Sequence, residues 1–394
     1  GGKAIVSNDF YLAIDSASSN NSISITGSGS SLILPANSEF SLGFAGSGNS
    51  VVVSNGGGLA ARQVTVGGAE TAQRNSLLVC GGVVTTRYTY VGDEGGWSNS
   101  ILLTGANSIL YATNTFACGV SGRASRVEIL NGARLLDGWG RIGWETGADS
   151  NTVIVSGAGS TWSNSYDLCV GLRGSYNTMI VSNGGTVWSG GWTPVGQESD
   201  SVGNTVIVTG PGSSWITTNI FLIGERGLSN RLEIRDGAYV SNAWYAYIGD
   251  SPGESSNAHG NSVLVTGPNS RWVCHSMLRM GDDSGWNRLE VRDGAFLSAS
   301  NVYLGMGSSS WTCNVIDVSG PGTIWTNTGM VDIDGHDNSC TVSNGPTVYS
   351  AELRASGEDS NTPVRIVLDG TNTQWFCAGR VVAGLSTSYG FITV

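Results

Sequence analysis

The residues best suited to chemistry lie in the stretch VDIDGHDN, which contains Asp332, Asp334, His336 and Asp337. Carboxylates beside a histidine could donate and accept protons at a glycosidic bond, as sites that cleave polysaccharides do. A second acidic stretch, GDDSG, carries Asp282 and Asp283. Both stretches fall where other segments carry GDE or GDS, so glycine-aspartate turns explain them more simply. We therefore expect no catalytic residues and no enzymatic activity.

Acidic turns recur along the chain, and their oxygens are the ligands that calcium prefers. However, the nine-residue calcium-roll pattern and the EF-hand loop are both absent from the sequence. We expect no cofactor and no metal, with calcium at these turns as the alternative. The 7 cysteines include no C-x-x-C pair, which argues against structural zinc. Their odd number leaves an intermolecular disulfide open.

The elements that must position these residues follow one repeat, as NTVIVTGPGSSW (residues 204–215) and NSVLVTGPNSRW (residues 261–272) illustrate. The leading residue recurs at steps that cluster near about 26 residues, which indicates stacked repeats. The leading asparagines are Asn21, Asn49, Asn75, Asn99, Asn151, Asn177, Asn204, Asn230, Asn261, Asn287, Asn314, Asn338 and Asn361, with Ser125 in one place. We expect their amides to form a hydrogen-bonded ladder at one corner. Turn propensity alone is the alternative.

Each repeat contains three short apolar segments separated by turns. In the first segment, positions two and four are apolar, as in Val206 and Val208, while the position between them is free, which is typical of a half-buried strand. A glycine turn follows, and a second segment carries tryptophan or another large apolar residue. A third segment ends in an apolar-glycine pair such as Ile223-Gly224. Three strands and three turns therefore make one coil.

This pattern predicts an all-β fold, a right-handed three-sided parallel β-helix (β-solenoid) with about 14 coils of about 26 residues. Coils about 4.8 Å apart would give a rod of about 65 Å. We expect a single elongated domain, 1–394, with a partial first coil (1–20), repeated coils (21–388) and a terminal strand (389–394). We also expect a stacked tryptophan series at matching positions: Trp162, Trp215, Trp272, Trp325 and Trp375.

Composition narrows the possible partners. The net charge of −11 argues against nucleic acid, because phosphate is bound by basic patches. No apolar run approaches the ~18 residues of a membrane span, so we expect no membrane insertion of this segment. The chain begins Gly1-Gly2 without methionine or a signal peptide, which predicts a processed N-terminus or an excised segment.

The block N-T-V-x-V-[ST]-G-x-G-S-x-W, the following apolar-glycine pair and the N-G-G or D-G-A block of alternate coils resemble the repeat of autotransporter passengers and PEP-CTERM-associated surface proteins. The resemblance extends from about Asn21 to Trp375 and is strongest from Asn151 to Trp325. It implies a β-helical protein that is exported and displayed on a bacterial surface. It implies no particular chemistry.

The two termini read as parts of one coil. YGFITV (residues 389–394) reads as a first strand, and residues 1–15 read as a turn followed by a second and a third strand. Joined, they match residues 77–95 in length and apolar placement. We predict a head-to-tail junction between subunits at Ala4, Ile5, Val6, Gly390, Phe391, Ile392 and Val394. The alternative is that these residues are one stretch of a longer repeat chain, in which any coil matches any other.

The function expected from these features is that of a non-enzymatic extracellular structural protein. The lead hypothesis is a subunit of a surface filament or sheath, whose partner is another copy of the chain. The alternative is the passenger or stalk of a surface adhesin that binds glycans or other cells. Under that alternative, the aromatic residues that could stack on sugars in glycine-rich corners are Trp97, Trp139, Trp144, Trp192 and Trp286.

Overall fold

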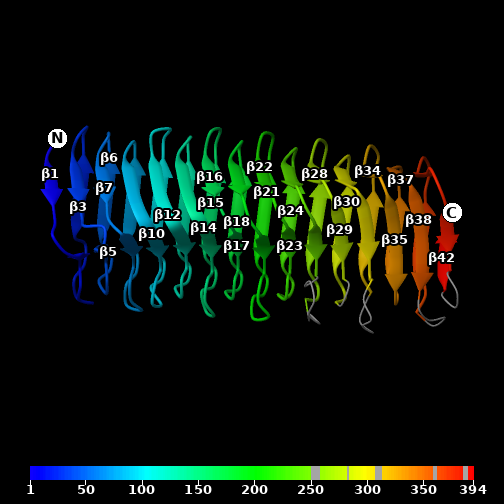
Figure 1. The fold of residues 1–394 in the computed structure, drawn as a ribbon, viewed down its shortest axis with the longest axis horizontal. Helices are drawn as coiled ribbons and strands as arrows, with labels where there is room; N and C mark the ends of the chain where they lie inside the picture. Colours follow the sequence, from blue (N-terminus) through cyan, green and yellow to red (C-terminus); the bar gives the residue numbers. More distant parts are fainter. Residues whose placement is uncertain (250–257, 282–283, 307–312, 358–361, 385–388) are drawn as a thin grey trace. The chain divides into compact units, whose positions relative to one another are not determined.

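The computed structural model describes residues 1–249, 258–281, 284–306, 313–357, 362–384 and 389–394. The chain divides into two compact units, Gly1–Gly191 (unit 1) and Trp192–Val394 (unit 2). Their regular structure is β-strand, and no helix in the described ranges is long and apolar enough to span a membrane. Parallel strands stack in coils, so the predicted all-β solenoid is confirmed. Figure 1 shows the strands of neighbouring coils side by side.

The first strands of the coils form one parallel sheet in each unit. In unit 1 they are β3 (Ser22–Thr26), β6 (Ser50–Ser54), β9 (Ser76–Cys80), β11 (Ser100–Thr104), β13 (Arg126–Leu130), β15 (Thr152–Ser156) and β18 (Thr178–Ser182). In unit 2 they are β21 (Thr205–Thr209), β24 (Arg231–Arg235), β27 (Ser262–Thr266), β30 (Arg288–Arg292), β33 (Val315–Ser319), β36 (Ser339–Ser343), β39 (Val364–Asp369) and β42 (Gly390–Thr393). The apolar, variable, apolar pattern places Val206 and Val208 of β21 fully inside, whereas Ile207 between them is half-buried.

The second strands carry the tryptophans. In unit 1 they are β1 (Lys3–Ile5), β4 (Ser31–Ile33), β7 (Gly58–Ala60), β16 (Thr161–Asn164) and β19 (Thr186–Ser189). In unit 2 they are β22 (Ser214–Thr217), β25 (Tyr239–Asn242), β28 (Arg271–Cys274), β31 (Phe296–Ala299), β34 (Ile324–Asn327), β37 (Thr347–Ser350) and β40 (Gln374–Cys377). Second strands of neighbouring coils pair in register, as Trp272 of β28 does with Leu297 of β31.

Most of the described third strands end at the apolar-glycine pairs. In unit 1 they are β2 (Phe10–Leu12), β5 (Glu39–Leu42), β8 (Gln63–Val66) and β17 (Leu168–Val170). In unit 2 they are β20 (Thr193–Val195), β23 (Phe221–Ile223), β26 (Ala246–Ile248), β29 (Met277–Met280), β32 (Asn301–Leu304), β35 (Met330–Gly335), β38 (Glu352–Gly357) and β41 (Val381–Ala383). In three coils of unit 1 the second and third strands merge, giving β10 (Val83–Val91), β12 (Ile109–Cys118) and β14 (Arg134–Ile142).

Left-handed backbone conformations set the corners. Asn183-Gly184 has φ of 51° and 82°, which are the values that an Asn-Gly turn favours. The residue before a ladder asparagine also has positive φ, as at Arg74 (55°) and Tyr176 (58°). Residues other than glycine, asparagine and aspartate rarely adopt positive φ, so the sequence gives no signal for this conformation at Arg74 or Tyr176. The stacking of the coils must therefore hold these residues in place.

Candidate functional site

The asparagines that lead the repeats form a buried ladder of amides. In unit 1, both the backbone N–H and the Nδ2 of Asn49 donate to Oδ1 of Asn75, at 3.0 and 2.9 Å. Asn75 repeats this arrangement with Asn99. In unit 2, Asn204 donates in the same way to Asn230, at 2.9 and 3.0 Å. The corner asparagines thus satisfy one another where water cannot reach them.

The ladder continues through each unit with few exceptions. The further bonds join Asn21 to Asn49 and Asn151 to Asn177 in unit 1, and Asn230 to Asn261, Asn261 to Asn287, Asn287 to Asn314 and Asn314 to Asn338 in unit 2. Asn361 lies outside the described residues. Asn21, in the outermost of the asparagine-led coils of unit 1, is exposed, whereas Asn261 is fully buried.

The ladder explains why the apolar-glycine pairs end in glycine. Gly224 has a φ of +71°, and a methyl group added to it would lie 2.2 Å from the amide carbon of Asn261. Gly67 stands in the same relation to Asn99, with 2.1 Å to Nδ2. Both the backbone conformation and the close approach of the amide therefore require glycine. The sequence shows the recurring pair but not its partner, because that partner belongs to a different coil.

Ser125 interrupts the ladder in unit 1. Its N–H donates to Oδ1 of Asn151 at 2.9 Å, as an asparagine would. Its own Oγ is buried and has no hydrogen-bond partner among the described residues. Gly92 is retained beside it. The backbone around Ser125 therefore leaves room for an asparagine side chain, although serine occupies the position.

The tryptophans of the predicted series lie at matching positions of alternate coils. Trp272 is paired with Val240 on one side and Leu297 on the other, so tryptophan occupies every second coil. Trp162, Trp215, Trp272 and Trp325 are fully buried, whereas Trp375 is only partly so. A large ring spans more than one coil spacing, and this is why Trp325 and Trp375 still approach each other, with ring centroids 5.8 Å apart.

Two residues beyond each tryptophan position lies an inward-facing residue of variable type. We call these residues the second polar column: Asp137, Asn164 and Ser189 in unit 1, and Thr217, Asn242, Cys274, Ala299, Asn327, Ser350 and Cys377 in unit 2. Nε1 of Trp272 donates to Oδ1 of Asn242 at 3.0 Å, and Nε1 of Trp375 donates to Oγ of Ser350 at 3.0 Å. The pattern of the sequence did not reveal this column.

The second polar column leaves several groups without partners. Nε1 of Trp325 has no partner among the described residues, and Ala299 stands at the position from which Asn242 and Ser350 accept in other coils. Nε1 of Trp215 is likewise unpaired in the part of the chain that the structure describes. In unit 1, Oδ2 of Asp137 accepts from Nε1 of Trp162 at 3.2 Å, but its Oδ1 is unpaired within the described chain. Burial raises the pKa of Asp137 well above its ordinary value, although the Trp162 hydrogen bond and Arg141 oppose this.

The candidate catalytic residues do not all lie in a turn, which corrects that part of the interpretation. Asp332 and Asp334 belong to strand β35, and His336 and Asp337 follow it. Asp332 is buried and lies 3.9 Å from Arg354, and burial followed by the Asp334 charge raises its pKa. His336 Nδ1 shares a hydrogen bond of 2.7 Å with Thr362. Asp282 and Asp283 lie outside the described residues.

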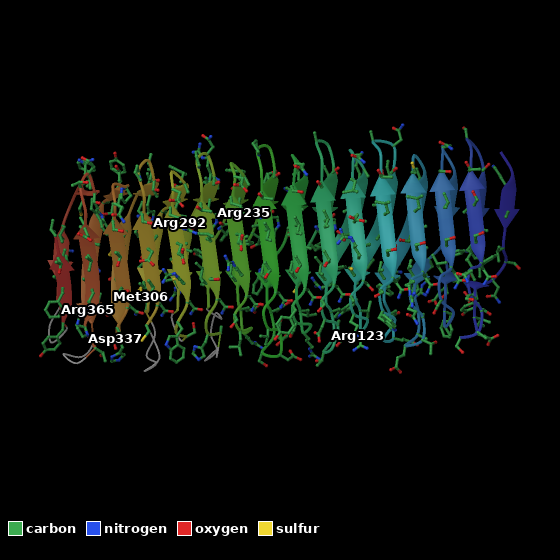
Figure 2. All side chains as sticks on the ribbon, turned by 180° about the vertical axis from the view of Figure 1, so that it is seen from behind. Arg123, Arg235, Arg292, Met306, Asp337 and Arg365 are labelled. Carbon is green, nitrogen blue, oxygen red and sulfur yellow. The ribbon has the colours of Figure 1, made fainter. Side chains whose placement is uncertain are left out.

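The outer face of the first-strand sheet carries ion pairs in unit 2. Glu233 of β24 lies 2.8 Å from Arg231 and 3.5 Å from Arg235. Figure 2 shows Arg235 and Arg292 on their strands. Exposed pairs of this kind contribute little to stability. Their alternating signs leave this face without a strongly charged patch.

The aromatic candidates for ligand stacking are dispersed. Trp139 lies in strand β14 rather than in a corner, and it stacks on exposed Tyr166 with centroids 4.5 Å apart. Trp144 contacts Tyr90 edge-on. Trp97 lines a cavity of about 340 Å³. In unit 2, Trp192 and Trp286 are exposed.

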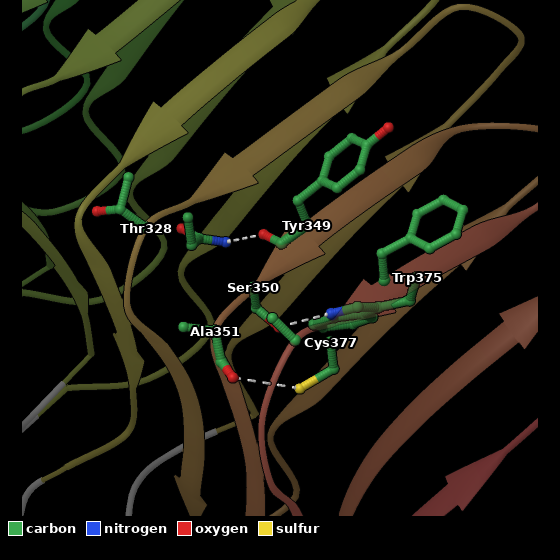
Figure 3. A pocket seen from close by; sticks show the side chains of 9 residues that line it. Thr328, Tyr349, Ser350, Ala351, Trp375 and Cys377 are labelled. Carbon is green, nitrogen blue, oxygen red and sulfur yellow. Dashed lines mark hydrogen bonds between the residues drawn. The ribbon is translucent and has the colours of Figure 1, made fainter.

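Two cavities accompany these aromatic residues. The one at Trp97 also contains Glu70, Glu94, Ser121 and Arg123, so it is polar. A larger one in unit 2, of about 600 Å³, lies where β34, β37 and β40 end and is lined by Tyr349, Trp375 and Cys377 (Figure 3). Cys377 is a free thiol, as are the other cysteines. Cys118, Cys169, Cys274 and Cys340 are buried, whereas Cys80 and Cys313 are exposed.

The predicted junction strands are exposed. Ile5 is 77 % exposed in β1, and Phe391 is 51 % exposed in β42. In unit 1, β1 pairs with β4, continuing the line of second strands. In unit 2, β42 pairs with β39, continuing the line of first strands. The two strands thus occupy different positions of a coil.

Comparisons with known proteins give no family. No family model matches the chain, and no curated protein matches it. One similar solved structure is that of a TibC-catalyzed hyper-glycosylated TibA fragment, with 11% identity, a TM-score of 0.35 and coverage of 100% of each chain. A similarity this low carries no conclusion about what this chain does.

Proposed function

We propose that this chain is a non-enzymatic structural β-solenoid of the bacterial cell surface, used as a subunit of an extracellular filament or sheath. The observation that carries the proposal is the uniformity of coil stacking. Nearly every described coil offers its neighbour the same parallel strands and the same ladder asparagine, as Asn204 offers Asn230 and Asn287 offers Asn314, with Ser125 as the exception. Growth by further coils needs no new kind of contact.

The partner proposed is a second copy of the chain. An outermost strand presents unpaired N–H and C=O groups, which a further strand can satisfy. Exposed apolar residues at β1 and β42, Ile5 and Phe391, favour such coverage. Strand β42 begins a coil that β1 and β2 of another copy would complete. A head-to-tail contact that does not close produces a filament.

Electron microscopy of the purified chain tests this proposal. We expect filaments that are lost when residues 390–394 are deleted or when Ile5→Lys places a charge on the strand edge. Ile14→Lys is the matched control, because Ile14 is also exposed but lies outside a strand. A longer natural chain would cover the same edges with its own next coil. Single particles of the parent chain at high concentration would therefore count against assembly between copies.

A second candidate is the passenger or stalk of a surface adhesin. The exposed stack of Trp139 on Tyr166, which is 53 % exposed, favours it, because aromatic faces bind sugars by stacking. Tyr166→Ala should then reduce binding of the chain to a glycan array without lowering the melting temperature. Tyr176→Ala removes another exposed tyrosine and is the control. Equal glycan binding by the two variants would contradict the adhesin proposal.

A further inference from the structure

A small cavity of about 230 Å³ opens on the third-strand face of unit 1. Its floor arises from strand register, since Tyr11, Ser41, Thr65 and Tyr90 occupy one row across β2, β5, β8 and β10. The two small hydroxyl residues lie between two tyrosines. The difference in side-chain size leaves a notch two coils wide.

The next row deepens the notch at the corner. Phe44, Gly68 and Asp93 follow the ends of the same strands, and Gly68 N–H donates to Gly43 O at 3.2 Å. A methyl group on Gly68 would lie 3.2 Å from the Phe44 ring. Phe44 and Tyr11 meet edge to face, with centroids 5.8 Å apart. One wall of the cavity is therefore aromatic.

Carboxylates also line this cavity: Glu39, Asp93 and Glu94. Glu39 is paired with Arg62 at 3.2 Å, but neither Asp93 nor Glu94 has an ion-pair partner within the described part of the chain. Glu94 has a φ of +42°, and its N–H donates to Oδ1 of Asp93 at 3.0 Å. Burial and the neighbouring carboxylates raise the pKa of Asp93. The cavity therefore holds more negative charge than its own residues neutralise.

A buried hydroxyl in the floor supplies independent evidence for a ligand. Ser41 is 3 % exposed, and its Oγ has no hydrogen-bond partner among the described residues. Buried polar groups are rarely left unpaired, and an occupant of the cavity would pair this one. Neighbouring Thr65 already accepts a hydrogen bond from Gln63 at 3.0 Å.

We infer that this cavity binds an organic ammonium group. An alkylammonium carries three donors, which match the Ser41 hydroxyl and the two carboxylates that have no ion-pair partner among the described residues, Asp93 and Glu94. Aromatic rings also attract such a charge by the cation–π effect, and Tyr11 and Phe44 both line the cavity. The described residues provide no cluster of three His, Cys, Asp or Glu side chains that could hold a metal ion. A site of this kind accepts either a free polyamine or a lysine side chain.

Isothermal titration calorimetry of the full chain with putrescine (1,4-diaminobutane) tests the inference. The double variant Asp93→Asn/Glu94→Gln should raise Kd by about tenfold or more, and Ser41→Ala by roughly threefold. Glu145→Gln is the control, because Glu145 is a corner carboxylate 3.8 Å from Arg173 and outside this cavity. Circular dichroism melting should show that each variant stays folded. Equal Kd values for the parent and the double variant would overturn the inference.

Further ligands separate the possible sources and the competing chemistry. Butane-1,4-diol has the length of putrescine without its charge and should not bind. Nα-acetyl-lysine amide that binds more tightly than putrescine would identify a lysine side chain as the natural occupant, and the reverse order would identify a free polyamine. Methyl glucoside binding that depends on Ser41 in the absence of any putrescine binding would replace the ammonium with a sugar.

Discussion

The asparagine ladder and the second polar column both place polar groups in the interior, but they differ in constancy. Apart from Ser125, the described ladder keeps one residue type, and Asn75, for example, uses its N–H, Nδ2 and Oδ1 in hydrogen bonds. The second polar column changes from coil to coil and leaves Oδ1 of Asn327 and Nε1 of Trp325 unpaired in the described structure. We infer that the ladder fixes how the coils align. In the second polar column, by contrast, the residue type varies with the side chain that it contacts in the neighbouring coil.

The largest effect is expected from removing a tryptophan ring that donates to the second polar column. Trp272→Ala should lower the free energy of unfolding by about 3–5 kcal/mol, because the ring is fully buried and its loss leaves Oδ1 of Asn242 without a donor. Trp375→Ala should cost less, since that ring is partly exposed. Denaturant titration of both variants measures the difference. Equal losses would show that burial does not govern the series.

A substitution in the ladder should cost more than one in the second column. Asn261→Ala leaves the N–H of Asn230 without its acceptor and leaves Nδ2 of Asn230 with only a 3.4 Å hydrogen bond to Ser201 O, so we expect a loss of about 2–3 kcal/mol. Asn327→Ala is the matched change in the second column, and it should cost about 1 kcal/mol or less, since its Oδ1 has no partner and Nδ2 bonds only at 3.4 Å. Both values come from urea unfolding curves. A reversed order would refute the distinction between the columns.

The pH dependence of stability should expose Asp137. Its pKa is raised in the folded chain, so its contribution is fully present below the ordinary carboxyl pKa and is lost as pH rises through the folded value. Each unit of elevation corresponds to about 1.4 kcal/mol. Asp137→Asn should therefore be more stable than the parent at pH 8 and similar at pH 4, as thermal unfolding would measure. A variant with the parent's pH profile would show that Asp137 does not contribute to it.

Completing the ladder should stabilise unit 1. Ser125→Asn places an amide where Ser125 Oγ is now unpaired and where Gly92 leaves room for it. We expect a gain of about 1 kcal/mol. Ser125→Ala removes the unpaired hydroxyl without adding an amide and provides the comparison. If alanine stabilised as much as asparagine, the gain would come from removing a buried hydroxyl and not from the ladder.

The smallest effect is expected from adding a missing hydrogen-bond acceptor to the second polar column. Ala299→Ser offers an acceptor to Nε1 of Trp325, in the place that Ser350 occupies for Trp375. The gain should be about 0.5–1 kcal/mol. Ala295→Ser, at another buried alanine that precedes β31, should be destabilising. Tryptophan fluorescence during unfolding follows both variants, and a loss of stability in Ala299→Ser would exclude the missing acceptor as the cause.

The repeat made the fold predictable, because period and alternation are local properties of the sequence. Val206, Val208 and Asn204 could be placed within a coil from spacing alone. Contacts between coils could not. The collision that makes Gly224 a glycine involves Asn261, and the cavity at Ser41 depends on the register of strands whose corners differ in length. Asp332 and Asp334 were expected in a turn but lie in strand β35, because glycine and aspartate are found both at strand ends and in turns.

The hydrogen bonds onto the Oδ1 atoms of the described ladder asparagines run in one direction, because each oxygen accepts from the preceding ladder residue. In unit 1, the amide of Asn49 donates toward Asn75, and in unit 2 that of Asn204 donates toward Asn230. Aligned hydrogen bonds polarise one another, so each ladder has an acceptor end and a donor end that differ chemically. Two copies brought together by like ends would oppose acceptor to acceptor or donor to donor. A fibre extended through such ladders would be a one-way structure, chemically different at its two tips.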